Sequence, residues 1–527
     1  MKNIFKTILL SAMVLGMSSC SEDKILDLNP INNISDQDAF STPTLIQSYM
    51  VGVYNNAAIG MYNSTTPNGG RGYVWGAAFV EQGEARGEDV VNMQTFYELT
   101  YKATNDASSP NNVFYWVDGY KLINRCNLMI EGAQGAVAKG IITQAVADDY
   151  IGQSKFLRAI THFELLNYFA KPYQFTAGAT HPGVIYREVG INTAAELTSE
   201  DNKPRNTVAE CYAKVLADLD DAEKLIATVG RGTGTGAATG TLVIGRASKA
   251  AAIAFKTRVY LQKRDWANVI AEGSKLTGRY ALTADPYAPF ALNIANSESI
   301  FSIVHTATLN PNTNAALASI LRNRALVCIS PILWRDSQWL ADDKRREDGK
   351  FIYTAPTNGV KYTNKYFDIT NLTDPAPVIR YAEVVLNMAE AQARLGTNLP
   401  AALTLLNQVR NRSLANPAAQ AYTSASYTSQ ADLVKLILKE RRIEFLQEGR
   451  RWSDIHRLQG DDLAPISGVP AKVASGIAPP KAAFDLTSNY VVTTPVDAIP
   501  YTDYKYLWPI PQIEMNTNLG IQQNPGW

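Results

Sequence analysis

The sequence predicts a mostly α-helical protein, built as an array of stacked helix pairs with large irregular insertions and minor β-structure. Two observations support this fold class. Several segments carry apolar residues three and four positions apart, the spacing of one face of an α-helix, and two of these segments have the form helix, short turn, helix. Between them lie stretches rich in Asn, Thr, Gly, Pro and Tyr, which favour turns and loops.

Four single helices are expected before the first helix pair. Residues 44–55 and 113–131 both show the helical spacing of apolar residues. A longer helix is expected from about 148 to 169, and its partner over 208–226. Thr207 directly precedes this partner and is a suitable N-cap, because its hydroxyl can accept a hydrogen bond from a free N–H of the first turn.

Two compact helix pairs define the array. Residues 247–276 and 381–412 each form a helix, a turn and a second helix, and in the latter Gly396 ends the first helix and Pro400 begins the second. Small residues such as Ala250 occur where the helices of a pair must approach closely. Pairs of about 34 residues with this pattern resemble tetratricopeptide repeats, which bury their apolar faces only by stacking. We therefore expect a scaffold of stacked helix pairs; unrelated antiparallel helix pairs are the alternative.

The rest of the chain is expected to form insertions on this scaffold. Aromatic residues recur in these insertions, and binding surfaces are often built on loops that a rigid scaffold positions. The glycine-rich stretch 230–240 has neither the spacing nor the flanking residues of a phosphate-binding loop, so it is interpreted as a connector. We expect one domain over 20–527, with the scaffold mainly from 40–60, 111–276 and 380–458, and insertions mainly from 60–110, 277–380 and 459–507.

The N-terminus indicates export and lipid anchoring. Lys2 and Lys6 precede a short apolar run, which is typical of a signal peptide and too short to span a membrane. MSSC (17–20) follows this run and has the pattern of a bacterial lipobox, so residues 1–19 are expected to be removed and Cys20 to be lipidated. Ordinary secretion with cleavage near the serines is the alternative. Acyl chains on Cys20 would hold the protein on a membrane, outside the cytoplasm.

Composition argues against several functional classes. The chain has 49 basic and 49 acidic residues, whereas a nucleic-acid-binding protein usually has a basic excess. Cys126, Cys211 and Cys328 are far apart and are expected to be buried thiols rather than disulfides or metal ligands. The four histidines form no metal-binding motif, and no nucleophile motif is present. We therefore expect no metal, no cofactor and no catalytic residues.

The charged stretch EGRRWSDIHRL (448–458) is predicted to be structural. The helix before it carries apolar residues on more than one face, so few of its faces can be solvated. Its glutamates recur every four residues beside arginines, which makes carboxylates and guanidinium groups neighbours. Such a buried network orients the elements that it joins. The residues assigned to it are Arg441, Glu444, Glu448, Arg451, Trp452, Asp454 and Arg457.

Four blocks of the sequence, in order, form a specific combination. They are CSEDKILDLNP (20–30), VIRYAEVVLNMAEAQARLG with ALTLLNQVRNR, KERRIEFLQEGRRWSDIHRL (439–458) and LWPIPQIEMNTNLGIQQNPGW. Together they resemble the SusD/RagB family, the surface lipoproteins of Bacteroidetes. The first block is similar to the family's acylated cysteine and acidic run, the second to its helix pair and the third to its most recognisable block. The last block is similar to the family's C-terminus, with Trp527 in place of the usual tyrosine.

The resemblance implies a scaffold of about four tetratricopeptide-like helix pairs that supports an irregular ligand-binding half. It also implies a binding protein of the outer membrane without catalytic activity. Members capture oligosaccharides, or peptides in some cases, and deliver them as a hinged lid to a SusC-like TonB-dependent transporter. A lipid-anchored glycoside hydrolase is the alternative from another class, since paired carboxylates are defined by geometry rather than by spacing.

The resemblance also implies where ligand contacts come from. In the family they lie in the N-terminal insertion and on aromatic residues of the later one. Aromatic faces with a few polar side chains suit the apolar faces and hydroxyl rim of a sugar. The expected contact residues are Tyr73, Trp75, Arg86, Asp89, Asn92 and Tyr97 in the first region, and Tyr287, Trp334 and Trp339 in the second.

Overall fold

The computed structural model describes residues 38–60, 70–227, 244–291 and 296–527. Cys20 and the 230–240 connector lie outside these ranges. The longer helices are α3 (Pro43–Ile59), α4 (Ala77–Ala85), α6 (Pro110–Ala138), α7 (Gln144–Phe169), α9 (Val208–Leu225), α11 (Lys249–Lys263), α12 (Trp266–Ser274), α15 (Tyr381–Leu395), α16 (Leu399–Asn411) and α18 (Gln430–Glu444). The short helices are α5 (Glu98–Lys102), α8 (Ala194–Glu200), α13 (Ala288–Ala291), α14 (Pro331–Trp334), α17 (Pro417–Gln420), α19 (Arg451–Arg457) and α20 (Gln512–Thr517).

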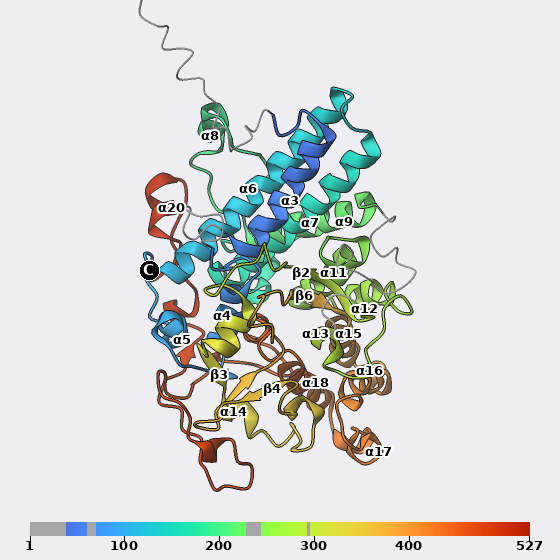
Figure 1. The fold of residues 1–527 in the computed structure, drawn as a ribbon, viewed down its shortest axis with the longest axis vertical. Coiled ribbons are helices and arrows are strands. Elements are labelled where there is room, and N and C mark those ends of the chain that lie inside the picture. Colours follow the sequence, from blue (N-terminus) through green and yellow to red (C-terminus); the bar gives the residue numbers. More distant parts are fainter. Residues whose placement is uncertain (1–37, 61–69, 228–243, 292–295) are drawn as a thin grey trace, which may run out of the picture.

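The helices stack in a continuous series, which confirms the predicted fold class. Helix α6 packs on α7, α7 on α9, α9 on α11 and α11 on α12, and α12 then packs on α15, which contacts both α16 and α18. Figure 1 shows α3, α6, α7 and α9 together at one end of the molecule, with the later pairs continuing the series along one side. Because each helix buries its apolar face on its neighbours, the core runs through the whole stack.

Several predicted helix ends coincide with identifiable caps. Thr207 accepts a hydrogen bond from the Glu210 backbone N–H, and the Glu210 side chain accepts one from the Thr207 backbone N–H, forming a complete capping box. Gly396 ends α15 with φ 71°, a left-handed conformation that glycine adopts without strain. Helix α6 is longer than the predicted 113–131, since Pro110 in its first turn is compatible with an earlier start.

The strands form only two-stranded antiparallel pairs among the described residues. They are β1 (Val90–Asn92) with β3 (Val327–Ile329), β2 (Ser299–Ile303) with β6 (Ala376–Arg380), β4 (Ile352–Thr354) with β5 (Lys361–Thr363), and β7 (Gly468–Val469) with β8 (Ile499–Pro500). The β1–β3 pair, with Val91 opposite Cys328, joins the N-terminal insertion to the 277–380 insertion. Cys126, Cys211 and Cys328 are buried free thiols, as predicted.

The 60–110 region contains a buried helix, which the sequence analysis did not predict. Every residue of α4 is buried, and the Glu84 carboxylate accepts hydrogen bonds from the backbone N–H groups of Gly449 and Arg450. A Cβ atom on Gly83 would lie 2.6 Å from the Gly449 carbonyl oxygen. Helix α4 therefore packs backbone to backbone against the turn after α18, and this part of the insertion belongs to the core.

Candidate functional site

The side chains predicted to contact a ligand lie mostly in the interior. Tyr287 is half-buried, and the other eight are at most 5% exposed. A side chain buried to this extent presents no face to a ligand. The placement corrects the expectation that these residues form an exposed binding surface. The eight are Tyr73, Trp75, Arg86, Asp89, Asn92, Tyr97, Trp334 and Trp339.

Several polar atoms of these residues form hydrogen bonds within the protein. The Trp75 indole donates to the Thr161 hydroxyl (3.4 Å), and the Tyr73 hydroxyl to Asn111 (3.1 Å). The Asn92 amide donates to the Gln94 carbonyl and the Ser475 hydroxyl, while Tyr97 packs edge-on against Phe96. The aromatic residues in the first region therefore bind the insertion to the helices beneath it.

The two tryptophans of the later insertion enclose an arginine. The Arg346 guanidinium lies 4.4 Å from the Trp334 ring centroid and 4.3 Å from that of Trp339, and Trp334 also donates to the Phe484 carbonyl. The Tyr287 hydroxyl donates to the Asn364 carbonyl (3.3 Å). A cation between two rings is a favourable packing arrangement, and it leaves both indoles covered.

The charged residues assigned to a structural cluster take part in a buried ion-pair network. Glu444 accepts from Arg345 (2.9 Å), Arg380 (2.7 Å) and Arg412 (2.7 Å), and Glu448 pairs with Arg380 (2.9 Å). Burial alone would raise the pKa of Glu444, but the surrounding guanidinium groups hold it far below its usual value. The network joins α18 to β6, α16 and the 335–380 segment.

A second part of the network joins α18 and α19 to α15. Asp454 pairs with Arg441 (3.2 Å) and Arg457 (2.8 Å), and Arg457 also binds Glu390 (2.7 Å). Burial favours protonation of Glu390, yet Arg457 and Arg394 lower the pKa of that carboxyl to about 2. Both carboxylates are therefore charged and fully engaged at neutral pH.

Arg86 and Asp89 also belong to this network. The Arg86 guanidinium lies 4.1 Å from the Trp452 ring centroid, and Trp452 donates to the Asn167 carbonyl (2.8 Å). Asp89 pairs with Arg442, and the neighbouring Glu88 pairs with Arg451 (2.6 Å). Two blocks that the sequence analysis assigned to separate roles thus form one buried unit.

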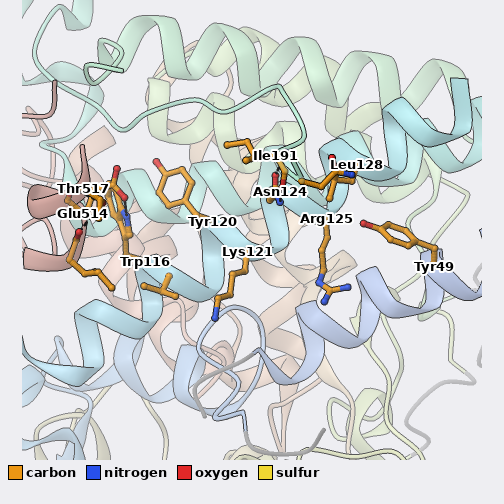
Figure 2. Close-up of a pocket in the computed structure, with 13 residues that line it drawn as sticks. Tyr49, Trp116, Tyr120, Lys121, Asn124, Arg125, Leu128, Ile191, Glu514 and Thr517 are labelled. Carbon is orange, nitrogen blue, oxygen red and sulfur yellow. Dashed lines mark hydrogen bonds between the residues drawn. The ribbon is translucent and has the colours of Figure 1, made fainter. Parts of the chain in front are cut away.

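One surface hollow lies over α6, with a volume of about 570 Å³ (Figure 2). Its polar groups are largely engaged by the protein, because Trp116 donates to Glu514 (3.2 Å), Tyr120 to the Ile185 carbonyl, and Asn124 to the Ile191 carbonyl. Lys121 and Arg125 extend from α6 in the same direction. The hollow offers charge at its edge but few free polar groups for a neutral ligand.

A smaller hollow of about 190 Å³ lies between the end of α3 and the loop after β2. We call it the α3–β2 hollow. Its polar walls come from three separate parts of the chain, and two exposed apolar residues border it. These lining residues are Val51, Tyr54, Asn55, Arg246, His305, Thr306 and Leu309. The volume suits part of an oligosaccharide rather than a whole one.

Three polar side chains of the α3–β2 hollow are available to a ligand. Within the described ranges, the side chains of Asn55, Arg246 and His305 make no hydrogen bond and no ion pair. The Arg246 guanidinium lies 4.4 Å from the Tyr54 ring centroid, and the Tyr54 hydroxyl is fixed by Gln153 and by the Ala247 backbone N–H. The arginine therefore rests on a rigid support.

The protonation state of His305 suits hydroxyl groups. Burial lowers the pKa of His305 to about 4, so the imidazole is neutral at neutral pH. A neutral imidazole has one donor nitrogen and one acceptor nitrogen. A sugar hydroxyl can also both donate and accept a hydrogen bond, so it can pair with either nitrogen. Arg246 and Asn55 add further donors. The hollow thus combines uncharged and cationic hydrogen-bonding groups with apolar edges.

Sequence reasoning missed Arg246 and gave His305 no binding role. His305 follows the strand-like segment SIFSIV, and a polar residue just after a strand could have indicated a loop site. Arg246 precedes α11 without a motif. Among the described residues, no cluster of three or more His, Cys, Asp or Glu side chains could hold a metal ion, and no helix is long and apolar enough to span a membrane.

The fold and the hollows define a helical-repeat protein with ligand-binding potential on its surface. Two family models match the chain: one described as "Starch-binding associating with outer membrane" over residues 24–261, and the SusD family over residues 335–527. Together they cover most of the sequence. The chain belongs to the SusD/RagB family.

Similar proteins agree with this assignment. SusD-like protein P38 of Formosa agariphila is 24% identical over 89% of this chain and 94% of its own length, and SusD-like protein P2 of the same organism is 22% identical over 98% of both. Among solved structures, a SusD superfamily protein from Bacteroides fragilis is 27% identical, with a TM-score of 0.71, covering 92% of this chain and all of that one. A putative sugar binding protein from Bacteroides vulgatus has a TM-score of 0.70 at 22% identity, over 92% of this chain and 99% of that one.

Proposed function

We propose that this protein is an oligosaccharide-binding lipoprotein of the outer membrane, anchored through Cys20 and facing outward. It captures oligosaccharides and passes them, as a hinged lid, to a SusC-like TonB-dependent transporter. The observation that carries the proposal is the match of residues 24–261 to the family model described as starch-binding and associated with the outer membrane.

The α3–β2 hollow supports this role and is our candidate for the oligosaccharide site. Its walls come from α3, from the residues just before α11 and from the 277–380 segment. The 277–380 segment is one of the two regions that the family resemblance implies, and α3 ends next to the other, 60–110. Asn55, Arg246 and His305 supply hydrogen-bonding groups with no partner in the described part of the chain. Groups of this kind fix the orientation of a sugar, while Tyr54 and Leu309 supply apolar contacts.

We further propose that the protein binds without catalysing hydrolysis. A glycosidase needs two carboxyl groups facing the substrate, one of them protonated. The acidic residues of the buried network are instead paired with arginines, as Glu444 and Asp454 show. Incubating the pure protein with soluble starch should release no reducing ends; their release would favour the lipid-anchored hydrolase.

Calorimetry with Arg246→Ala and His305→Ala tests the proposed site. Each variant should weaken the binding of maltoheptaose, or of whichever glycan of a panel binds, by about tenfold or more, because one or two hydrogen bonds are lost. The thermal midpoint of Arg246→Ala should change little, since this side chain makes no hydrogen bond and no ion pair within the described chain. Arg279→Ala is a control outside the hollow.

Two results would refute the proposed function. One is binding of peptides and of no glycan. The other is a pull-down from outer membranes that never recovers a large barrel protein together with this chain.

A further inference from the structure

Two exposed aromatic rings mark a hollow separate from the α3–β2 hollow. Among the large hydrophobic side chains exposed in the described residues, the only aromatic ones are Phe175 (49%) and Tyr504 (42%). Both line the same hollow of about 740 Å³, which we call the C-terminal hollow. It shares no lining residue with the α3–β2 hollow. Exposing an apolar ring costs free energy, so two rings in one hollow indicate a binding surface.

Each ring is held in place by its neighbours. Phe175 makes edge contacts with His181, at 5.2 Å between ring centroids, and with Tyr501, at 6.1 Å. The Trp527 ring meets Tyr504 edge to face, at 4.8 Å and 83°. Preorganised aromatic rings lose little conformational entropy when a ligand stacks on them. The C-terminal residue thus supports one of the two platforms.

The base of the hollow is equally rigid. The Lys171 ammonium donates to the Tyr501 carbonyl (2.6 Å) and lies 4.2 Å from the Tyr501 ring centroid. Both His181 ring nitrogens are engaged, one by the Thr176 hydroxyl and one by the Lys171 carbonyl. Burial lowers the pKa of Lys171 to about 8, so it remains largely protonated at neutral pH.

Three polar side chains remain available at this hollow. Asp503 uses one carboxylate oxygen to accept from the Lys505 backbone N–H, and no hydrogen bond of the other is found within the described ranges. The side chains of Thr502 and Gln522 make no hydrogen bond in the same part of the chain. A hydroxyl, a carboxylate and an amide can together pair with several sugar hydroxyls.

We propose that the C-terminal hollow is a second carbohydrate-binding site, where Phe175 and Tyr504 stack on sugar rings and Thr502, Asp503 and Gln522 pair with hydroxyls. This inference rests on the proposed function. Flat apolar faces beside a few polar groups match the two kinds of surface on a pyranose. A purely apolar partner would bury the second carboxylate oxygen of Asp503 without a hydrogen bond, which is costly in free energy.

Two sites on one molecule predict a dependence on ligand length. A polysaccharide that spans both sites binds the second one intramolecularly, so its overall affinity exceeds that of either site. A trisaccharide can occupy only one site at a time. Loss of the C-terminal hollow should therefore weaken polysaccharide binding while leaving trisaccharide binding at the α3–β2 hollow unchanged.

The test compares Phe175→Ala/Tyr504→Ala with the unmodified full chain. Native gels are cast with soluble starch, xylan, mannan or levan, and the trisaccharide of each retarding polymer is titrated by calorimetry. The double variant should lose about tenfold or more in polysaccharide affinity, retain its trisaccharide affinity, and keep its thermal midpoint. Ile477→Ala, which removes an exposed side chain (66%) outside the hollow, is the matched control.

The outcomes separate this inference from the proposed function. If the double variant is retarded as strongly as the unmodified chain, while Arg246→Ala loses binding, the second site is refuted and the proposed function stands. If no polysaccharide retards the unmodified chain, the proposed function and the second site both fail. If the double variant unfolds, Gln522→Ala and Thr502→Ala replace it, because they remove only exposed polar groups. These variants should also lose affinity for the polysaccharide and retain affinity for the trisaccharide.

Discussion

Trp75 illustrates how an aromatic side chain in an insertion can belong to the core. It is 1% exposed, packs on Phe79 at 4.9 Å between ring centroids, and donates to Thr161. We predict that Trp75→Ala lowers the free energy of unfolding by about 3–5 kcal/mol, as expected for a large-to-small change in a packed core. Chemical denaturation measures this effect.

Trp452→Ala provides the comparison, because Trp452 is equally buried and is expected to show a loss of similar size. In both variants the molecules that remain folded should bind oligosaccharide as the unmodified chain does. If Trp75→Ala had normal stability but reduced affinity for oligosaccharide, Trp75 would be a ligand contact rather than a core residue.

His305 predicts a pH dependence of stability. Its pKa is lowered by burial from 6.5 to about 4 in the folded state, so between these values the unfolded state binds one more proton than the folded state. Stability then falls as pH decreases from about 6.5 to about 4, by about 1.4 kcal/mol per pH unit for this residue. His305→Asn should reduce the slope of stability against pH by that amount.

The measurement is urea unfolding at several pH values, compared between the variant and the unmodified chain. The comparison is needed because other groups titrate in the same window. Burial raises the pKa of Glu84 to about 7, so protonation of Glu84 makes stability increase as pH falls, opposite to the effect of His305. Burial lowers the pKa of His456 to about 3, which acts in the same direction as His305. Parallel curves for the two proteins would show that His305 is protonated equally in both states.

At the level of elements, α4 and the turn after α18 fit together only because two glycines meet. The Gly449 backbone has φ 76°, and a Cβ on Gly83 would lie 2.6 Å from the Gly449 carbonyl oxygen. We predict that Gly83→Ala destabilises the protein by several kcal/mol, since backbone atoms must move. Thermal unfolding measures the change.

Gly135→Ala is the matched control for this prediction. It lies within α6, where an added Cβ would meet no atom within 4 Å. Alanine has the higher helix propensity, so this variant should be as stable as the unmodified chain or more stable by up to about 1 kcal/mol. Equal effects of the two substitutions would contradict the close fit of α4.

The arginine–carboxylate network predicts a large effect of a single charge. Glu444→Ala leaves Arg345, Arg380 and Arg412 buried with one counter-charge fewer. We predict a loss of about 3–5 kcal/mol in the free energy of unfolding. The exposed pair of Glu347 with Lys350 (3.0 Å) is the control, and Glu347→Ala should change stability by less than about 1 kcal/mol. Similar losses in both variants would show that burial adds nothing to the network.

Across the whole molecule, the sequence predicted what depends on local pattern. Thr207 and Gly396 mark helix ends through capping chemistry that acts over a few residues, and these predictions are confirmed. The role of Asp89 depends on Arg442, 353 positions away along the chain. No local sequence pattern records a contact over that distance. The sequence alone therefore could not show which residues of the insertions lie in the core and which lie on a binding surface.

The same long-range contacts bear on how the whole chain folds. The regions matched by the two family models, 24–261 and 335–527, exchange buried elements: α11 packs on α15, α4 on α19, and Trp452 of the second region donates to Asn167 of the first. Each region alone would expose apolar faces and charged side chains that have lost their ion-pair partners.

We predict that neither 24–261 nor 335–527, expressed separately, reaches the packed state of the full chain. Near-ultraviolet circular dichroism of each fragment should show weak aromatic signals and no sharp thermal transition, whereas the full chain shows both. A fragment 24–261 that melts cooperatively would instead demonstrate two independent folding units.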